Sequence, residues 1–408
     1  MTRASTRSSR YWAERFVVTG LAERRFEMTL RNRVLFGVGE VARLGDAIEA
    51  AGGWRVFLVT DPGVVAAGVA DRALASSEYP ATIYSDVEPN PAGTTIERGA
   101  VALRSYGLEG TVIVAMGGGS AMDAAKAIAL CAANDRPVWE LEYDGADLVP
   151  GRPIVALPTT AGTGSEAHPF AVITHEEIGR KDYIGHRSLL PVTTILDPGL
   201  TVGLPPGTTA ATGVDALTHS LESLLSRNGN PFAEAMAIGV IRTVHEWLPR
   251  AIADGTDLEA RSQMLMAAHL AGVGQASGTG VGLVHALGHA LGTRGRLAHG
   301  TALAAVLPEV LRFYAGEPGL RDRELALVGV ALEAATPTEE PATAAGAAIG
   351  ELRQFLASVG QRHRLASLGF DDAGLDVVAQ DAIDDAAIRN SPRLPTLAEA
   401  RGILASVA

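Results

Sequence analysis

The sequence has little of what several classes of protein require. Its 408 residues contain one cysteine, Cys131, which cannot form an internal disulfide, so we expect a reducing compartment, with the cytoplasm as the default. No apolar run approaches the roughly 20 residues needed to cross a bilayer, so we expect a soluble protein without a membrane partner. Lys and Arg number 34 against 46 Asp and Glu, for a net charge of −12. Polyanion binding needs clustered cations, so nucleic acid is not an expected partner.

Aromatic residues are also scarce, at 5%, whereas 47% of the residues are hydrophobic and 46 are glycines. This composition is typical of an α/β enzyme rich in small residues. The length exceeds the usual size of one hydrophobic core, so we expect two domains. Short β-branched apolar runs at 54–60, 111–116 and 153–158 lead into turns and helical stretches. This alternation predicts a mostly parallel sheet that is covered on both faces.

The pattern changes after residue 198, where the turns DPG and LPPG mark a boundary. Long helical stretches follow at 210–226, 231–253, 257–274 and 282–292, with no convincing strand between them. We therefore predict an α/β dinucleotide-binding domain at 16–198 and an all-helical metal-binding domain at 199–408. Residues 1–15 are basic and rich in Ser and Thr but lack the apolar core of a secretion signal. We interpret them as a flexible N-terminal extension.

Two loops that follow predicted strands have the composition of a dinucleotide site. Gly117-Gly118-Gly119-Ser120 stands where a strand turns into a helix, so backbone N–H groups and the positive end of the helix can face a pyrophosphate. The run from Thr159 to Ser165 is placed to close over the nucleotide from the other side. Tight turns also use glycine for purely conformational reasons, and the triplet is not the usual G-x-G-x-x-G, so a structural role is the alternative.

The residue that ends the first strand of this unit bears on the choice of cofactor. Asp61 stands where a carboxylate can accept a hydrogen bond from a ribose 2′-hydroxyl and repel a 2′-phosphate. This position favours NAD(H) over NADP(H). A turn-forming aspartate before Pro62 is the alternative interpretation.

One carboxylate and several clustered histidines predict a metal site. Asp215 and His219 are four residues apart and share a helix face, and His285 and His289 repeat this spacing. His299 follows a glycine-rich bend that can fold it back. A single histidine in an apolar helix is more often a hydrogen-bonded core residue, but a carboxylate with three imidazoles suits Fe(II) or Zn(II). Such an ion acts as a Lewis acid on a substrate oxygen, and the remaining histidine is a candidate proton relay.

Several longer segments occur together in the order and spacing of one family. They are GGGSAMDAAKAIA (117–129), PTTAGTGSE (158–166), DPGLTVGLPP (197–206), GVDALTHSLES (213–223), GLVHALGHALG (282–292) and LAHG (297–300). In these segments the chain resembles the iron-containing, or group III, alcohol dehydrogenases over nearly its whole length. The resemblance implies the dehydroquinate-synthase-like architecture, with a parallel-sheet domain, an all-helical domain, an active site in the cleft between them, and a homodimer or larger homo-oligomer.

The resemblance also implies roles for particular residues. In similar proteins the metal is held by the Asp and His of the D-A-L-T-H segment and by two histidines spaced 14 apart, which here are Asp215, His219, His285 and His299. His289 matches an additional active-site histidine and is the implied catalytic residue. The cofactor contacts expected from the loops and the resemblance together are Asp61, Asn90, Gly117, Gly118, Gly119, Ser120, Asp123, Thr159, Thr160, Thr163, Val172 and Lys181.

Departures from the family pattern bear on the substrate. The segment from Glu166 to Phe170, EAHPF, replaces the more usual E-V-T-x-x, and Arg294 and Arg296 precede His299. We therefore expect His168, Phe170, Arg294 and Arg296 to contact the substrate. Two arginines between metal ligands could select an anionic aldehyde, such as a carboxylic semialdehyde or phosphonoacetaldehyde. The alternative is that these arginines are solvated or pair with acids at the domain cleft.

These features together predict a metal-dependent, NAD(P)(H)-linked alcohol dehydrogenase or aldehyde reductase acting on a small primary alcohol or its aldehyde. A related branch, the maleylacetate reductases, shares the fold and takes an anionic substrate but tends to lose the complete metal set, which is intact here. Two alternatives come from other classes. One is a dehydroquinate-synthase-like lyase, whose different metal-binding motifs are not apparent, and the other is a non-catalytic nucleotide-binding protein.

Overall fold

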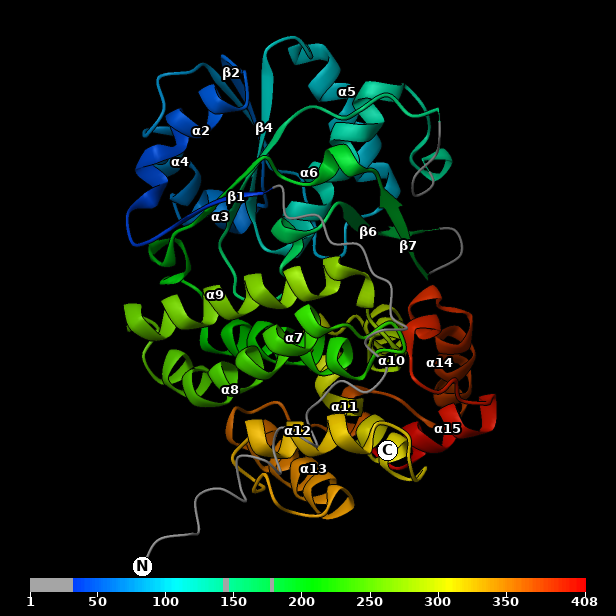
Figure 1. Ribbon diagram of the computed structural model, residues 1–408. Coiled ribbons are helices and arrows are strands. Elements are labelled where there is room, and N and C mark those ends of the chain that lie inside the picture. The colour runs from blue at the N-terminus through cyan, green and yellow to red at the C-terminus, as the bar shows by residue number, and fades with distance from the viewer. Residues whose placement is uncertain (1–31, 142–146, 177–179) are drawn as a thin grey trace, which may run out of the picture.

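A computed structural model describes residues 32–141, 147–176 and 180–408, which form a sheet domain and a helical domain that lie against one another (Figure 1). The predicted extension at 1–15 lies outside the described residues. The sheet domain comes first in the chain and the helical domain second, which confirms the predicted fold class. Among the described residues, no helix is both long and apolar enough to cross a lipid bilayer.

The sheet domain is built on six parallel strands in the order β1-β8-β5-β4-β2-β3. The strands are β1 (Arg33–Phe36), β2 (Arg55–Val59), β3 (Ala81–Tyr84), β4 (Thr111–Gly117), β5 (Ile154–Pro158) and β8 (Thr193–Leu196). The helices that connect them are α2 (Leu44–Ala50), α3 (Pro62–Ala66), α4 (Val69–Leu74), α5 (Gly93–Tyr106) and α6 (Gly119–Asn134).

The side chains of β2 point alternately to the two faces of the sheet and are apolar on both, which explains why helices cover both faces. Val56 and Leu58 belong to the apolar cluster that α2 and α4 complete, whereas Phe57 and Val59 belong to the cluster that α5 and α6 complete. Successive side chains of a strand point to opposite faces, so a continuous apolar run needs a helical layer on each side. The sequence prediction of a doubly covered parallel sheet is confirmed.

An antiparallel hairpin departs from this parallel plan. Strands β6 (Phe170–His175) and β7 (Arg180–Gly185) pair with one another and not with the large sheet. The hairpin extends from the sheet domain toward the helical domain, where β7 contacts a helix of that domain (Figure 1). It was not expected from the sequence, and it carries several of the predicted site residues to the domain junction.

From residue 199 to residue 408 the chain contains helices and no strand. The α-helices there are α7 (Pro206–Leu225), α8 (Pro231–Ala253), α9 (Leu258–Gly274), α10 (Leu283–Gly295), α11 (His299–Ala315), α12 (Asp322–Ala331), α13 (Pro341–Ser358), α14 (Asp372–Asp384) and α15 (Leu397–Ala405). Every residue of α7 from Gly213 to Leu225 is buried. A helix that is buried on all sides is a central one, so its polar side chains must find partners inside the protein.

The two domains touch closely at one pair of glycines. A Cβ atom on Gly272 in α9 would lie 2.3 Å from the carbonyl oxygen of Gly164, which no real side chain tolerates. Beside this contact, His269 Nδ1 lies 3.0 Å from Glu166 Oε1, and both side chains are buried. The junction is therefore fixed by backbone contact and by a buried polar pair.

Candidate active site

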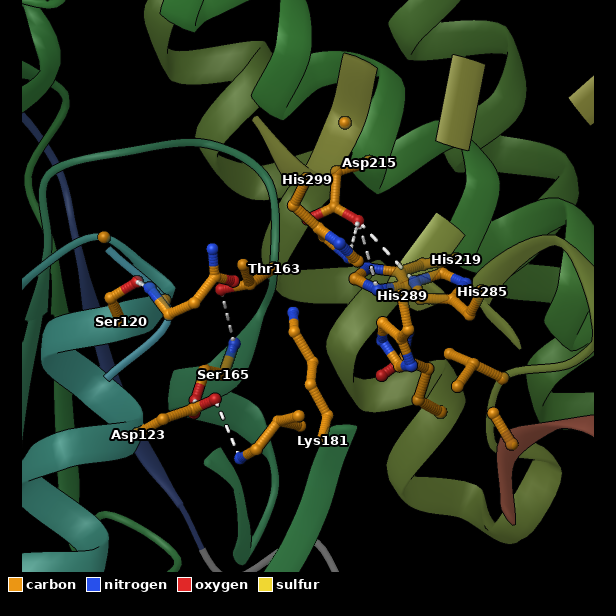
Figure 2. Close-up of a pocket in the computed structure, with 18 of the residues that line it drawn as sticks. Ser120, Asp123, Thr163, Ser165, Lys181, Asp215, His219, His285, His289 and His299 are labelled. Atoms are coloured by element: carbon orange, nitrogen blue, oxygen red, sulfur yellow. Dashed lines mark hydrogen bonds and ion pairs between the residues drawn. The ribbon is translucent and has the colours of Figure 1, made fainter. Parts of the chain in front are cut away.

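A cavity of about 840 Å³ lies at this junction, and residues of both domains line it. Its volume is within the range of small-molecule and cofactor sites. The loops that follow β4 and β5 line one side of the cavity, and helices α7, α10 and α11 line the other. Figure 2 shows Ser120 and Thr163 on one side and the clustered histidines on the other. Crevices at the carboxyl ends of parallel strands are where open α/β sheets bind ligands.

The glycine triplet lies at the N-terminus of α6, where an added side chain would be crowded by the second loop. A Cβ on Gly119 would lie 2.4 Å from Thr163 Cγ2, and one on Gly118 would lie 3.2 Å from Thr160 Cγ2. Gly117 has a φ of +144°, a conformation that L side chains rarely adopt. The N–H groups of this helix end and the hydroxyls of the second loop therefore face the same space, as a phosphate cradle requires. The predicted cofactor residues that line the cavity are Asn90, Gly118, Gly119, Ser120, Asp123, Thr160, Thr163, Val172 and Lys181.

Gly117, Thr159 and Asp61 lie behind this lining. Asp61 is the N-cap of α3, and its Oδ1 accepts hydrogen bonds from the N–H groups of Gly63 at 2.8 Å and Val64 at 3.0 Å. Its Oδ2 is 3.2 Å from the position of a Cβ on Gly117, so it points toward the glycine loop. One carboxylate oxygen thus caps α3, as the alternative interpretation held, while the other lies beside Gly117, outside the cavity lining.

Asp123 holds the second loop and the hairpin together. Its Oδ1 accepts a hydrogen bond from Ser165 Oγ at 2.6 Å, and its Oδ2 accepts one from the N–H of Val172 at 3.0 Å (Figure 2). Burial raises the pKa of Asp123, and the nearby Lys126 ammonium works against that rise. Because both oxygens are occupied by protein groups, Asp123 shapes the cofactor site more than it offers a free acceptor.

Lys126 lies beneath this network and is almost fully buried. Its Nζ donates to the carbonyl oxygen and the Oγ of Ser165, both at 2.6 Å, and to the carbonyl oxygen of Phe170 at 2.9 Å. Burial lowers the pKa of Lys126 to about 8, although the carboxylates of Asp123 and Glu166 oppose the shift. The lysine ties α6 to the segment that bears the predicted substrate residues.

The hairpin supplies residues that face the centre of the cavity. Lys181 projects from β7 into the space between the phosphate cradle and the histidines (Figure 2), and burial lowers its pKa. His168 and Phe170 also line the cavity, and their rings stack with centroids 3.6 Å apart. Burial and then Lys126 keep the pKa of His168 well below its usual value, so this ring is neutral. Tyr183, which the sequence did not single out, lines the same wall and has a buried hydroxyl.

The carboxylate and three of the histidines converge across three helices. The Nε2 atoms of His219, His285 and His299 lie 3.4, 3.7 and 3.5 Å from Oδ1 of Asp215 (Figure 2). Asp215 and His219 come from one face of α7, His285 from α10, and His299 is the first residue of α11. The four-residue spacing places the first pair side by side, and the bend between α10 and α11 returns His299 to the same point.

The chemistry of this donor set fits a divalent metal ion. Asp215 Oδ1 and His285 Nε2 are buried and have no hydrogen-bond partner among the described residues. Buried polar atoms rarely stay unpaired, so atoms that converge in this state suit a cation. Three imidazole nitrogens and one carboxylate match the preferences of Fe(II) or Zn(II). Burial lowers the pKa of His219 to about 4, with Asp215 opposing, which leaves this ring in the neutral form that binds metal.

Two carboxylates that the sequence did not single out orient the histidines. Glu222 Oε2 lies 2.5 Å from His285 Nδ1, and Asp385 Oδ2 lies 2.8 Å from His289 Nδ1. Burial works against it, but Glu222 and Asp215 together raise the pKa of His285 to about 9, so metal binding there would release a proton. Glu222 follows His219 by three residues on a helix, a spacing that could have revealed it. Asp385 is 96 residues from His289 in the chain and left no such signal.

The structure corrects the prediction that Arg294 and Arg296 face the substrate. The guanidinium group of Arg294 binds the carboxylate of Asp381 on α14, with Nε 2.7 Å from Oδ2, and neither arginine lines the cavity. Helix α10 runs on to Gly295, so Arg294 stands nine residues after His285, about half a turn away from the histidine face. Arg296 caps the helix with a φ of +51° and is exposed.

The fold and this site together define an enzyme of the two-domain type in which a nucleotide-binding sheet faces a helical, metal-binding domain. Comparison with known proteins gives the family. Residues 31–198 match the sequence family described as iron-containing alcohol dehydrogenase. Residues 209–408 match the family described as the C-terminal part of the Fe-containing alcohol dehydrogenases. The chain belongs to the iron-containing alcohol dehydrogenase family and is an oxidoreductase acting on CH–OH groups, as the sequence predicted.

Similar proteins match over nearly their whole length. The probable alcohol dehydrogenase EutG of Salmonella typhimurium is 36% identical over 368 residues, which are 90% of this chain and 90% of that protein. The NAD-dependent methanol dehydrogenase of Bacillus methanolicus is 32% identical over 376 residues, which are 91% and 96%. The crystal structure of a 1,3-propanediol oxidoreductase superposes with a TM-score of 0.89 at 31% identity, covering 94% of this chain and all of that one.

Proposed function

We propose that this enzyme interconverts a small primary alcohol and its aldehyde, with NAD(H) as cofactor and a divalent metal held by Asp215, His219, His285 and His299. One observation carries the proposal. Ligand atoms of Asp215, His285 and His299 lie within 4.8 Å of one another, and His219 Nε2 lies 3.4 Å from Asp215 Oδ1, in a cavity whose other end is lined by the glycine loop before α6. A metal bound there supplies Lewis-acid polarisation of the substrate oxygen, and a nicotinamide dinucleotide supplies the hydride acceptor or donor.

The protein's own groups divide the remaining work. The N-terminus of α6, with Gly118 and Gly119, would hold the pyrophosphate through backbone N–H groups, and Thr160 and Thr163 would close over it. Lys181 extends from β7 to where it could reach the nicotinamide ribose. His289 lines the cavity beside the metal ligands and would take the proton that leaves the alcohol.

The preference for NAD(H) rests on Asp61. Its Oδ2 points toward the glycine loop, where it would accept a hydrogen bond from a ribose 2′-hydroxyl and repel a 2′-phosphate. A relative named as NAD-dependent supports the proposal. The ratio of kcat/KM for NADH to that for NADPH should be well above one and should fall at least tenfold in Asp61→Ser, whose hydroxyl can still cap α3. An unchanged ratio would remove Asp61 from cofactor selection.

A neutral substrate fits the cavity better than an anionic one. The inner wall includes Phe170, Val172 and Val281, and Lys181 is the one Lys or Arg side chain among the described lining residues. Arg294 and Arg296 lie outside the cavity lining, so they do not supply the positive charge that an anionic aldehyde would need. We therefore place neutral alcohols first, with a carboxylic semialdehyde, phosphonoacetaldehyde or maleylacetate as the competing substrates in the assay.

Metal dependence tests the proposal. Protein stripped by a chelator should lose alcohol-dependent NADH formation and regain it with Fe(II) or Zn(II), whereas His219→Ala should stay inactive when metal is restored. Turnover that is indifferent to metal would contradict the proposal. A lyase of the dehydroquinate-synthase type would turn over without net NADH, and a non-catalytic protein would bind NADH but leave a broad aldehyde panel unreduced.

We also propose that the enzyme forms a homodimer or larger homo-oligomer, as its family resemblance implies. Light scattering on the eluting peak of a size-exclusion column measures the mass directly. One chain has a mass of 42.3 kDa, so a species near that mass at micromolar concentration would contradict the proposal.

A further inference from the structure

A buried Asp–His pair joins two helical segments at the wall of the cavity. His289 on α10 lines the cavity, and its Nδ1 lies 2.8 Å from Oδ2 of Asp385 (Figure 2 shows the place of His289). Asp385 follows α14 and stands at the N-cap of the short helix η9 (Ala386–Asn390). The side chains are only 6% and 9% exposed, so water does not compete for the contact between them.

The carboxylate of Asp385 is held in one orientation by a second contact. Its Oδ1 accepts a hydrogen bond from the backbone N–H of Ala387 at 2.7 Å, so each oxygen has its own donor. Burial pushes the pKa of Asp385 upward, but the contacts with His289, the N–H of Ala387 and the nearby His285 together hold the pKa below its ordinary value. Asp385 is therefore ionised and can only accept hydrogen bonds.

An acceptor at this position decides which nitrogen of His289 carries the hydrogen. Nδ1 must bear it in order to donate to Asp385, which leaves a lone pair on Nε2. A neutral imidazole with its lone pair toward the cavity is a proton acceptor, whereas the opposite tautomer would present a hydrogen there.

We propose that Asp385 is a positioning residue, which fixes His289 as the Nδ1–H tautomer and so leaves Nε2 free to accept the proton from the substrate. This inference rests on the role given to His289 in the proposed function. In alcohol oxidation the O–H bond would break with its proton passing to His289 Nε2, and the C–H bond would break with its hydride taken up by the nicotinamide that the sheet domain would hold. The products are the aldehyde, the reduced cofactor and a protonated imidazole, which returns the proton to solvent.

Asp385→Asn gives a sharp test because it keeps the shape of the side chain. Asparagine has one oxygen and one NH2 group. If its oxygen keeps the bond from the Ala387 N–H, its NH2 group faces His289 Nδ1 and requires a lone pair there. The hydrogen of the ring then moves to Nε2, and the proton acceptor is lost. We expect kcat for alcohol oxidation to fall at least 100-fold, the usual minimum for removal of a general base, while NADH affinity and metal content stay within threefold.

The tautomer itself can be read without any turnover. Zinc-loaded protein with ¹⁵N-labelled histidine rings should show distinct ¹⁵N shifts for Nδ1–H and Nε2–H, with His289 assigned by its absence in His289→Gln. Wild type should have the Nδ1–H form and Asp385→Asn the Nε2–H form. Asp384→Asn is the matched control, because Asp384 is the exposed neighbour and contacts Gln380. It should change neither kcat nor the spectrum.

A double-variant cycle separates positioning from a purely structural effect. In the His289→Gln background, Asp385→Asn should cause no further loss of kcat, because the ring on which it acts is gone. A further loss there, an unchanged tautomer in Asp385→Asn, or an unchanged kcat despite the altered tautomer would each overturn the proposal. If metal-loaded wild type forms no NADH from any alcohol, the proposed function fails, and the tautomer measurement still shows whether Asp385 orients His289.

Discussion

His285 Nδ1 lies 2.5 Å from Glu222 Oε2, and both side chains are buried. Glu222 is itself fixed, because its two oxygens accept hydrogen bonds from the backbone N–H groups of Gly282 at 2.9 Å and Val284 at 2.7 Å. With a metal bound, this contact would keep the hydrogen of His285 on Nδ1 and leave the lone pair of Nε2 for the cation. A carboxylate behind a metal-binding histidine sets the orientation and basicity of the ring.

Glu222→Gln should weaken metal binding by about 10- to 100-fold, because the amide places a donor where the imidazole needs an acceptor. Titration of metal-free protein with Zn(II) against a chromophoric chelator measures the change. Glu351→Gln is the control, since Glu351 forms a similar 3.0 Å contact with His245 away from the cavity. Equal zinc affinities in the two variants would mean that Glu222 has no role in metal binding.

Gly119→Ala should raise the dissociation constant for NADH at least tenfold. The added Cβ would lie 2.4 Å from Thr163 Cγ2, so the two loops of the phosphate cradle would have to separate. Isothermal titration with NADH measures the effect. Gly346→Ala in α13 meets nothing within 4 Å and should leave NADH binding unchanged, while stabilising its helix by about 0.5–1 kcal/mol. Tight binding by Gly119→Ala would place the pyrophosphate elsewhere.

Arg294→Ala should alter KM for anionic and neutral aldehydes to the same small extent, within twofold. Arg294 is bound to Asp381 and is 44% exposed, outside the cavity lining. A surface pair of this kind contributes about 0–1 kcal/mol, so the unfolding free energy should change little. Steady-state kinetics with aldehydes of matched size and different charge give the comparison. A rise in KM for the anionic aldehydes alone would show that Arg294 contacts the substrate.

The buried Lys126 should make stability depend on pH. Its pKa is about 8 in the folded chain, below the value of about 10.4 for an unfolded lysine, so the unfolded chain binds more protons between these pH values. The unfolding free energy should therefore rise with pH in this window, and Lys126→Met should lack that part of the rise. Urea unfolding at pH 7.5 and 9.5 should show the wild type gaining about 2 kcal/mol over the variant. A difference independent of pH would contradict this.

Cys131 should be unreactive in the native enzyme. Its side chain is buried, and burial raises the pKa of the thiol to about 11, so almost no thiolate forms at pH 8. A chromogenic disulfide reagent should label no thiol in the folded protein and one thiol per chain in urea. Rapid labelling under native conditions would mean that α6 opens locally, and Cys131→Ala would then identify the reacting group.

Most of the fold could be predicted because local patterns determine it. The runs ending near Thr60 and Met116 are too apolar for a half-exposed strand, so a doubly covered sheet followed directly. Helix α8 was expected at 231–253 and occupies those residues, since Asn230 caps it and Pro231 starts it. The β6–β7 hairpin was missed because Phe170, Val172, Lys181 and Tyr183 line the cavity, which mixes apolar and polar residues on that face of the hairpin.

The candidate site, like the fold, could be predicted only in part from the sequence. Asp215 and His219 could be predicted from helical spacing, and His285 and His299 from their clustered motif, whereas Asp385, which no motif marks, could not. Asp385 reaches His289 only because α14 packs against α10, a tertiary contact without a local pattern. Arg294 was misplaced because α10 extends to Gly295, and three residues more of helix turn the side chain to the opposite face. Helix ends are the least certain part of a sequence prediction.

All four side chains of the proposed metal centre belong to the helical domain, whereas the phosphate cradle belongs to the sheet domain. The distance between the proposed metal centre and the proposed phosphate cradle therefore depends on how the two domains meet, and Gly164 and Gly272 are one place where they meet closely. A methyl group on Gly272 would act as a wedge that touches no reacting atom and yet lengthens that distance. The absence of side chains at Gly164 and Gly272 thus lets the two halves of the proposed active site lie close together.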